Sequence, residues 1–110
     1  MTHSGRIGAL RRKLILERPV DTPDESGGFS RAWSALASVW CEIESLRGDT
    51  TFAASSEETT LTHRIRLRWR PDVDNAARLR WGSRAFAVVS AIDADAARRY
   101  LICHCREYDA

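Results

Sequence analysis

The sequence has few residues of the kinds that disulfide frameworks and membrane anchors require. Its 110 residues include only three cysteines, and an odd number in a chain of this kind argues against a disulfide framework. No apolar run approaches the roughly 20 residues that cross a bilayer, and the first residues lack the apolar segment and cleavage site of a signal peptide. We therefore expect a chain made in the cytoplasm, or assembled there into a particle, without contact with a membrane.

Recognisable catalytic motifs are missing as well. The chain has no nucleophile elbow, no phosphate-binding glycine loop and no metal-ligating His-Glu motif. Glu42 and Glu44 share one face of an expected strand, where a solvated surface explains them better than an acid-base pair. We expect no catalytic residue and no cofactor. A small enzyme of unrecognised type stays a remote alternative, which would need a pocket with perturbed titratable groups.

The nearest approach to a metal motif is Cys103-His104-Cys105, with Cys41 and His63 as further candidate ligands. On a strand, Cys103 and Cys105 would share one face while His104 points to the other. Structural zinc motifs space paired cysteines by two to four residues on a turn, and buried free cysteines are common. The pattern therefore predicts core cysteines and no metal site.

Length and composition are typical of one soluble globular domain. The hydrophobic fraction is 44% and the charged fraction 29%, and 110 residues leave no room for a second core. We expect residues 1–110 to form a single domain. Residues 1–10 are expected to be flexible or to form a short helical lead-in, the helical candidate being residues 4–11.

The hydrophobic periodicity is mostly that of strands. Prolines, acids and a double glycine between Pro19 and Phe29 predict a long exposed turn within a hairpin, and residues 48–58 have caps and composition that suit a short helix. The fold class predicted is mainly β: a small antiparallel β-barrel or sandwich of about six strands with one short helix. The expected strands cover residues 12–18, 29–33, 38–44, 60–70, 78–81, 85–92 and 100–107.

Charge is unevenly distributed along a chain whose net charge is only +2. Residues 17–58 have a net charge of −6 and residues 63–84 a net charge of +5, which suits different partners on different surfaces. The basic row on one strand face has three interpretations: a solvated barrel face, pairing with acids of a neighbouring copy, or sequence-independent contact with nucleic acid. The candidate basic interface or DNA-facing set is Arg64, Arg66, Arg68, Arg70, Arg78 and Arg80, and the candidate acidic interface is Glu42, Glu44, Glu57 and Glu58.

Four tryptophans are many for this length: Trp33, Trp40, Trp69 and Trp81. Packing in the core or at an interface explains them best, and base stacking is the alternative.

The order of several segments resembles the phage head–tail joining protein family, the small head-closure or stopper proteins of long-tailed phages and gene transfer agents. The likeness covers roughly residues 5–107, and no single motif is diagnostic. After Arg70 the family commonly has a Pro-Gly-type turn, whereas here the loop is Pro71 to Asn75. The segments that carry the likeness are Gly5-Arg6-Ile7, Leu10-Arg11, Leu14 to Pro19, Asp24 to Phe29, Trp33, Val39 to Glu44, Gly48, Phe52-Ala53-Ala54, Thr62 to Arg68 and Arg84-Ala85-Phe86.

The resemblance implies a ring of small barrels, sixfold or twelvefold, below the portal and adaptor of a virion or gene transfer agent particle. Such a ring closes the DNA exit channel and receives the tail, so the implied partners are copies of the chain itself, the portal or adaptor ring, a tail terminator or other tail proteins, and packaged DNA transiently in the channel. We expect the turn with Asp21, Asp24, Glu25, Gly27 and Gly28 to project toward the channel or a neighbouring connector ring. A sequence-independent nucleic-acid-binding β-barrel is the alternative.

Overall fold

Strands form all the regular structure that the computed structural model describes, which covers residues 10–46, 51–54 and 57–109. Every strand pair is antiparallel. Within these residues no helix is long and apolar enough to cross a membrane. The strands are β1 (Arg12–Pro23), β2 (Phe29–Ser45), β3 (Thr51–Ala54), β4 (Glu57–Thr60), β5 (His63–Arg68), β6 (Arg78–Trp81), β7 (Arg84–Asp93) and β8 (Tyr100–Asp109).

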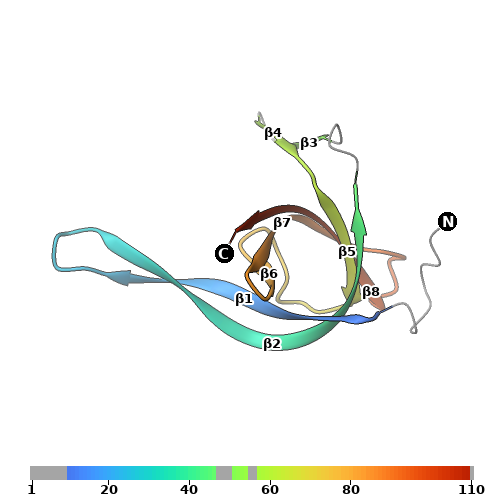
Figure 1. The fold of residues 1–110 in the computed structure, drawn as a ribbon, viewed down its shortest axis with the longest axis horizontal. Helices are drawn as coiled ribbons and strands as arrows, with labels where there is room; N and C mark the ends of the chain where they lie inside the picture. The colour runs from blue at the N-terminus through green and yellow to red at the C-terminus, as the bar shows by residue number, and fades with distance from the viewer. Residues whose placement is uncertain (1–9, 47–50, 55–56, 110) are drawn as a thin grey trace.

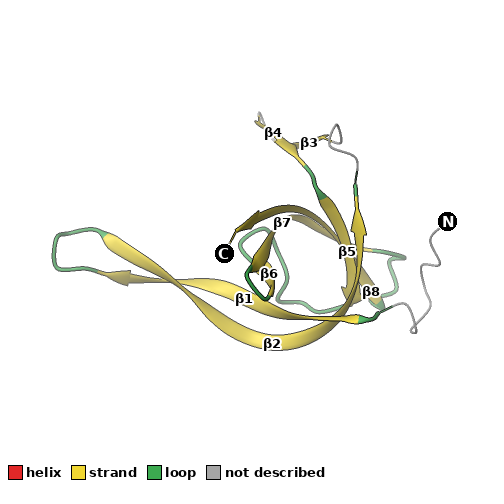
Figure 2. Ribbon diagram, in the orientation of Figure 1, coloured by secondary structure: helices red, strands yellow, loops and turns green. Residues whose placement is uncertain are grey.

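Six of these strands close into a barrel in the order β1-β2-β5-β8-β7-β6, with β6 paired back to β1 (Figures 1 and 2). The prediction of a mainly β fold is therefore confirmed, and the choice between barrel and sandwich is resolved as a barrel. Closure pairs the strands on both sides within the barrel, which removes the exposed edges that make open sheets prone to aggregate.

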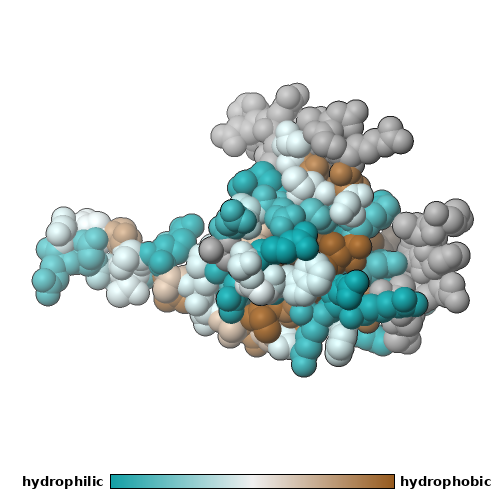
Figure 3. Space-filling model, in the orientation of Figure 1, coloured by the Kyte–Doolittle hydropathy of each residue, from teal (hydrophilic) through white to brown (hydrophobic). Residues whose placement is uncertain are grey.

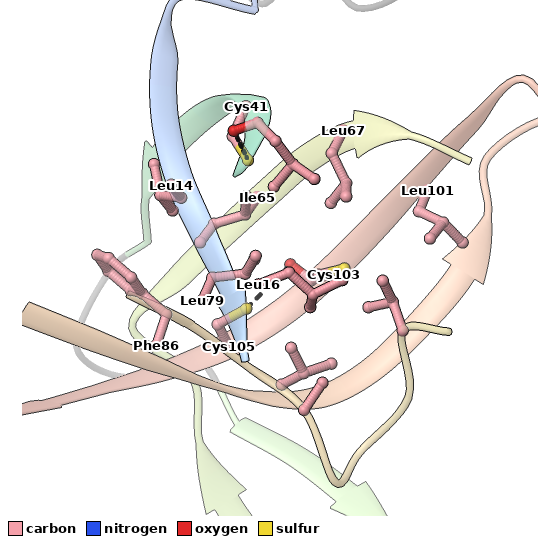
Figure 4. Close-up of a cluster of buried hydrophobic side chains, with 14 residues drawn as sticks. Leu14, Leu16, Cys41, Ile65, Leu67, Leu79, Phe86, Leu101, Cys103 and Cys105 are labelled. Atoms are coloured by element: carbon pink, nitrogen blue, oxygen red, sulfur yellow. Dashed lines mark hydrogen bonds between the residues drawn. The ribbon is translucent and has the colours of Figure 1, made fainter. Parts of the chain in front are cut away.

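The barrel interior is filled by alternate side chains of its strands, as the period of two requires. Leu14 and Leu16 of β1 face Ile65 and Leu67 of β5 in one cluster, with Phe86 at one end (Figure 4). The prediction of core cysteines is confirmed, because Cys41, Cys103 and Cys105 are buried in the same cluster.

The predicted short helix within residues 48–58 is wrong for the part that the structure describes, because Thr51–Ala54 and Glu57–Thr60 are the paired strands β3 and β4. Thr51 pairs with Thr60, and Phe52 with Thr59. β-branched threonines favour strands, and an isolated helix of about eleven residues is marginal in water. Strand pairing therefore prevails over helix formation.

The long turn predicted between Pro19 and Phe29 is also wrong in extent, because β1 continues to Pro23 and only residues 24–28 form the turn. Of the predicted helical lead-in, Leu10 and Arg11 are not helical, and residues 1–9 lie outside the described residues.

None of the four tryptophans is buried, and each lies at the surface beneath a cation. Trp69 and Trp81 pack against the core from outside, whereas Trp40 is 54% exposed. The quadrupole of an aromatic ring attracts a cation that lies over its face, which stabilises the contact. The cations are Arg78 over Trp33, Lys13 over Trp40, Arg98 over Trp69, and Arg12 and Arg84 over Trp81.

Candidate functional site

The β1–β2 hairpin extends well beyond the barrel, and we call residues 20–32 the arm (Figure 1). Every residue of the arm is exposed, whereas Leu14 and Leu16 on the same strand are fully buried. The arm lengthens the molecule to 52 Å against 30 and 27 Å in the other directions. On the face drawn in Figure 3 its surface is mostly hydrophilic. The arm therefore contributes little to the core, so its length needs another explanation.

The tip of the arm is a tight turn built around Asp24. The Asp24 backbone N–H donates to the Gly28 carbonyl (2.9 Å), and its carboxylate accepts from the N–H groups of Ser26 and Gly28 (both 2.9 Å). Gly27 has φ of +84°, a left-handed conformation that costs other residues about 1–2 kcal/mol. The sequence placed Asp24, Gly27 and Gly28 at a loop tip, and the structure places them there as turn-forming residues.

The two edges of the arm differ because β1 contains two prolines. Hydrogen-bonded and non-hydrogen-bonded pairs alternate along an antiparallel ladder. Since Asp24 bonds to Gly28, the pairs Pro23–Phe29 and Pro19–Trp33 fall in the non-hydrogen-bonded class. The nitrogens of both prolines therefore face the outer edge of β1, where no donor is needed, and they protect that edge from pairing.

Asp21 forms an ion pair across the arm. Its ladder partner is Arg31, whose Nε donates to Asp21 Oδ1 at 2.8 Å and whose Nη2 donates to Oδ2 at 3.1 Å. The hydrogen bonds from Arg31 lower the pKa of Asp21 below its ordinary value. Both side chains are solvated, so the pair adds little stability. The pair joins the two strands of the arm and so helps to order it. With Asp21 paired and Asp24 bonded within the turn, Glu25 is the acid at the tip that has no partner among the described residues.

At the base of the arm, a β-bulge lies between Leu16 and Glu17, where Leu36 of β2 is the extra residue. A bulge bends and twists the strand that contains it, which directs the arm away from the barrel wall. Glu17 is only 5% exposed and lies opposite Arg78 in the β1–β6 ladder. It accepts from Arg78 Nε at 2.7 Å and Arg80 Nε at 3.2 Å.

Arg78 links the base of the arm to the barrel on one face. Its guanidinium lies 4.1 Å from the centre of the Trp33 ring and donates to the Tyr108 hydroxyl at 3.1 Å. Burial by itself would lower the pKa of Arg78, but the hydrogen bonds to Tyr108 and Glu17 outweigh it and the pKa is raised. Arg78 is therefore charged at any physiological pH.

The opposite face of the base is held by Arg18 and the loop after β5. Arg18 donates to both carboxylate oxygens of Asp74, at 2.8 and 3.3 Å, and to the Asp72 carbonyl at 3.1 Å. The hydrogen bond from Arg18 is the main reason why the pKa of Asp74 is lowered. The loop that departs from the expected Pro-Gly turn thus has a defined role. We call the contacts of Glu17, Arg18, Trp33, Arg78 and Asp74 the clamp, since they fix the arm from both faces.

The predicted basic set does not form an open cationic surface. Five of its six arginines pair with acids of the same chain, and only Arg68 has no carboxylate partner among the described residues. Arg66 is 4% exposed and stacks 4.0 Å from the centre of the Tyr100 ring. The pairs are Arg64 with Glu44, Arg66 with Glu42 at 3.6 Å, Arg70 with Asp72 at 2.9 Å, and Arg78 and Arg80 with Glu17.

The predicted acidic set is divided. Glu42 and Glu44 lie directly opposite Arg66 and Arg64 in the β2–β5 ladder, so two segments of opposite charge meet within one chain. Cross-strand pairs of opposite charge stabilise a sheet by roughly 0.2–1 kcal/mol each. Glu57 and Glu58 lie in β4, and their side chains lie outside the described part of the structure.

The cysteines and histidines that the structure describes do not gather at one site. Burial raises the pKa of Cys41 and of Cys103 to about 12, so both stay protonated thiols, and His104 points away from them on the opposite face of β8. His63 packs its ring edge-on to Phe86 at 4.9 Å, and burial lowers its pKa. Within the residues that the structure describes, no cluster of three or more potential ligands is found.

Sequence reasoning located the tip of the arm and missed its base. Glu17, Arg18, Trp33 and Asp74 were not candidate site residues, and Arg78 was assigned to an interface. Glu17 and Arg78 are 61 residues apart. One signal was available: Glu17 and Arg18 are charged residues within an expected strand, where buried charges occur only when paired.

Comparison with known proteins supports one family. A family model of the phage head completion proteins matches residues 5–108. A chain from the virion of a native gene transfer agent particle is 29% identical, with a TM-score of 0.67 over 92% of this chain and 97% of that chain. A protein of Shigella flexneri 2a, known from its solution structure, is 24% identical with a TM-score of 0.70 over 93% and 96% of the two chains, and supports the fold alone. No match was found among curated proteins.

The family match includes every strand of the barrel, the arm and the clamp. The match therefore extends over the whole described fold and is not limited to one motif, and it confirms the resemblance seen in the sequence. The chain belongs to the phage head completion protein family.

Proposed function

We propose that the chain forms a ring at the head–tail junction, between the portal or adaptor and the tail. There it closes the DNA exit channel and offers the surface on which the tail docks. The family supports the coarser part of this statement, since head completion proteins are structural components of the virion. The ring, its neighbours and the docking of the tail are the finer part, and the clamped arm is the observation that supports them.

A channel plug needs an element that leaves the body of its subunit and keeps a fixed direction. The arm extends about six residues past its base, which is about 20 Å at the rise of a strand. The clamp holds it on both faces through Arg78 with Trp33 and through Arg18 with Asp74. An arm ordered before assembly loses less conformational entropy on docking than a loose loop does.

The charge of the tip suits a position beside DNA that must pass without sticking. Asp21, Asp24 and Glu25 are the acids of the arm, and Arg31 is its one base. Phosphates carry most of the affinity of proteins for DNA through contacts with cations. A negatively charged tip therefore repels the duplex, so that a closed channel opens without a strong protein–DNA contact to break.

The nucleic-acid-binding alternative receives less support. It requires the six arginines of the predicted basic set to face phosphates, yet five of them already have carboxylate partners in the same chain. Exchanging those partners for phosphates would leave acids beside the DNA, which is unfavourable. The barrel therefore suits protein contacts better than a duplex.

The test shortens the arm without disturbing the clamp. Residues 21–31 are replaced by Asn-Gly, which joins Val20 to its ladder partner Ala32 through the turn that two-residue hairpins favour. Particles assembled with this variant are expected to contain the protein and yet lose packaged DNA or fail to accept tails. Nuclease-protected DNA per particle and the fraction of tailed particles are the two measurements.

The matched control is Thr22→Ala with Ser30→Ala, which changes an exposed cross-strand pair and keeps the length of the arm. It should retain DNA and tails at the wild-type level. Normal DNA retention and normal tailing by the shortened variant would contradict the proposal that the arm closes the channel.

A further inference from the structure

A notch opens in the barrel wall where β5 leaves β2. The two strands pair only between Cys41–Ser45 and His63–Leu67, and beyond that ladder the Trp69 N–H donates to the Arg99 carbonyl, so the chain follows β8 instead. The separation leaves a pocket of about 280 Å³. Its lining residues are Ser38, Val39 and Trp40 of β2, with Arg68, Trp69 and Arg70 opposite.

The notch offers cations that have no acid partner among the described residues, although Arg12, Arg98 and Arg106 elsewhere also lie over aromatic rings without a salt bridge. Arg70 is paired with Asp72, whereas Arg68 is exposed and contacts only the Tyr100 ring, 6.0 Å from its centre. Lys13 lies over the Trp40 ring at 5.8 Å and likewise has no carboxylate partner among the described residues. An aromatic floor with exposed cations at its rim suits an acidic segment that also has an apolar residue.

The tip of the arm has the complementary properties. Asp21 is paired with Arg31, and Asp24 accepts the hydrogen bonds of the turn. Glu25 is therefore the acid of the arm that has no partner among the described residues. Phe29, at the first position after the turn, is 71% exposed. Glu25 cannot reach Arg68 of its own chain, because about nine strand residues, or roughly 30 Å, separate the start of β2 from Ser38.

We propose that the tip of the arm of one copy docks in the notch of the next copy, with Glu25 facing Arg68. Such a contact joins two different patches of identical chains and so generates a ring when its rotation closes. The inference rests on the proposed function, because it supplies the contact between neighbours that the ring needs. It gives the arm a second role, as the fastener between subunits.

The test is disulfide trapping in assembled particles with Ser26→Cys and Ser38→Cys in one chain. A disulfide needs Cα atoms within about 7 Å, so the length of the arm excludes a bond within one copy and every bond formed joins two copies. Oxidised particles are expected to give a ladder of multimers on a non-reducing gel. Ser26→Cys alone and Ser26→Cys with Arg106→Cys are the controls, and both should give no ladder.

Charge reversal in the variant with Ser26→Cys and Ser38→Cys checks whether Glu25 pairs with Arg68. Arg68→Glu should abolish the ladder, and adding Glu25→Arg should restore it, which a merely misfolded variant would not do. If particles with Ser26→Cys and Ser38→Cys retain DNA but give no ladder, the proposed contact is overturned and the proposed function is left intact. Salt-dependent DNA binding that is lost with Arg68→Glu, in the absence of a ladder, assigns the notch to nucleic acid and also overturns it.

Discussion

Neutralising Glu17 should destabilise the protein far more than neutralising Asp74, although each carboxylate pairs with arginine at the base of the arm. The Glu17 and Arg78 side chains are 6% and 11% exposed, whereas those of Asp74 and Arg18 are 57% and 33% exposed. Removing one partner of a buried pair leaves a charge uncompensated, and hydrogen bonds to charged groups contribute about 1.5–3 kcal/mol.

We therefore expect Glu17→Gln to lower the free energy of unfolding by about 2–3 kcal/mol. Arg78 keeps its contacts with Tyr108 and Trp33, which limits the loss. Asp74→Asn keeps the oxygen that accepts from the Ala76 N–H and should cost less than about 1 kcal/mol, as exposed pairs do.

Urea denaturation of the two variants measures the difference, and hydrogen exchange of the arm reports whether it is freed. Exchange in the β1–β2 ladder next to the arm should accelerate in Glu17→Gln and change little in Asp74→Asn. Equal losses of stability in the two variants would refute the reasoning that the buried face of the clamp dominates.

Three further predictions concern the core, the tip and pH. Phe86→Ala should cost about 3–5 kcal/mol in urea denaturation, because the ring is fully buried; a loss below 1 kcal/mol would show that the barrel end is loosely packed. Gly27→Ala should cost about 1 kcal/mol from backbone strain alone, since an added Cβ meets nothing within 4 Å, and an unchanged stability would refute the left-handed assignment. Burial lowers the pKa of His63 in the folded state below its ordinary 6.5, so the unfolded state binds more protons and stability should fall as pH decreases through 6.5 toward the folded-state pKa. His63→Gln should flatten that dependence between pH 7.5 and 5.5, and an unaltered slope would assign it to other groups.

The sequence predicted strands well where one face is buried and the other is not. In β5, Ile65 and Leu67 alternate with Arg64 and Arg66, and the structure places the first pair in the core and the second pair opposite the acids of β2. Arg66 is an exception to the expected solvated face, because it is only 4% exposed and stacks on the Tyr100 ring. Such alternation is a local property, so a single chain segment contains it. The buried cysteines of β8 follow from the same period of two.

The errors arose where a residue's role depends on a distant neighbour. Pro19 and Pro23 indicate a turn when taken alone, but they fit a strand whose outer edge needs no donor. The clamp joins β1 to β6 and to the loop after β5, and the pairing of strands that are not consecutive cannot be read from local periodicity. Residues 48–58 had weak helix signals, which strand pairing outweighed in residues 51–54 and 57–58.

Electron cryomicroscopy of assembled particles tests the central claim most directly, by comparing wild type with the variant whose arm is shortened between Val20 and Ala32. The account predicts a ring of barrels between the portal or adaptor and the tail, with wild-type density from the arm across the channel and none in the variant. Barrels found elsewhere in the particle, or a channel equally closed in both, would contradict it.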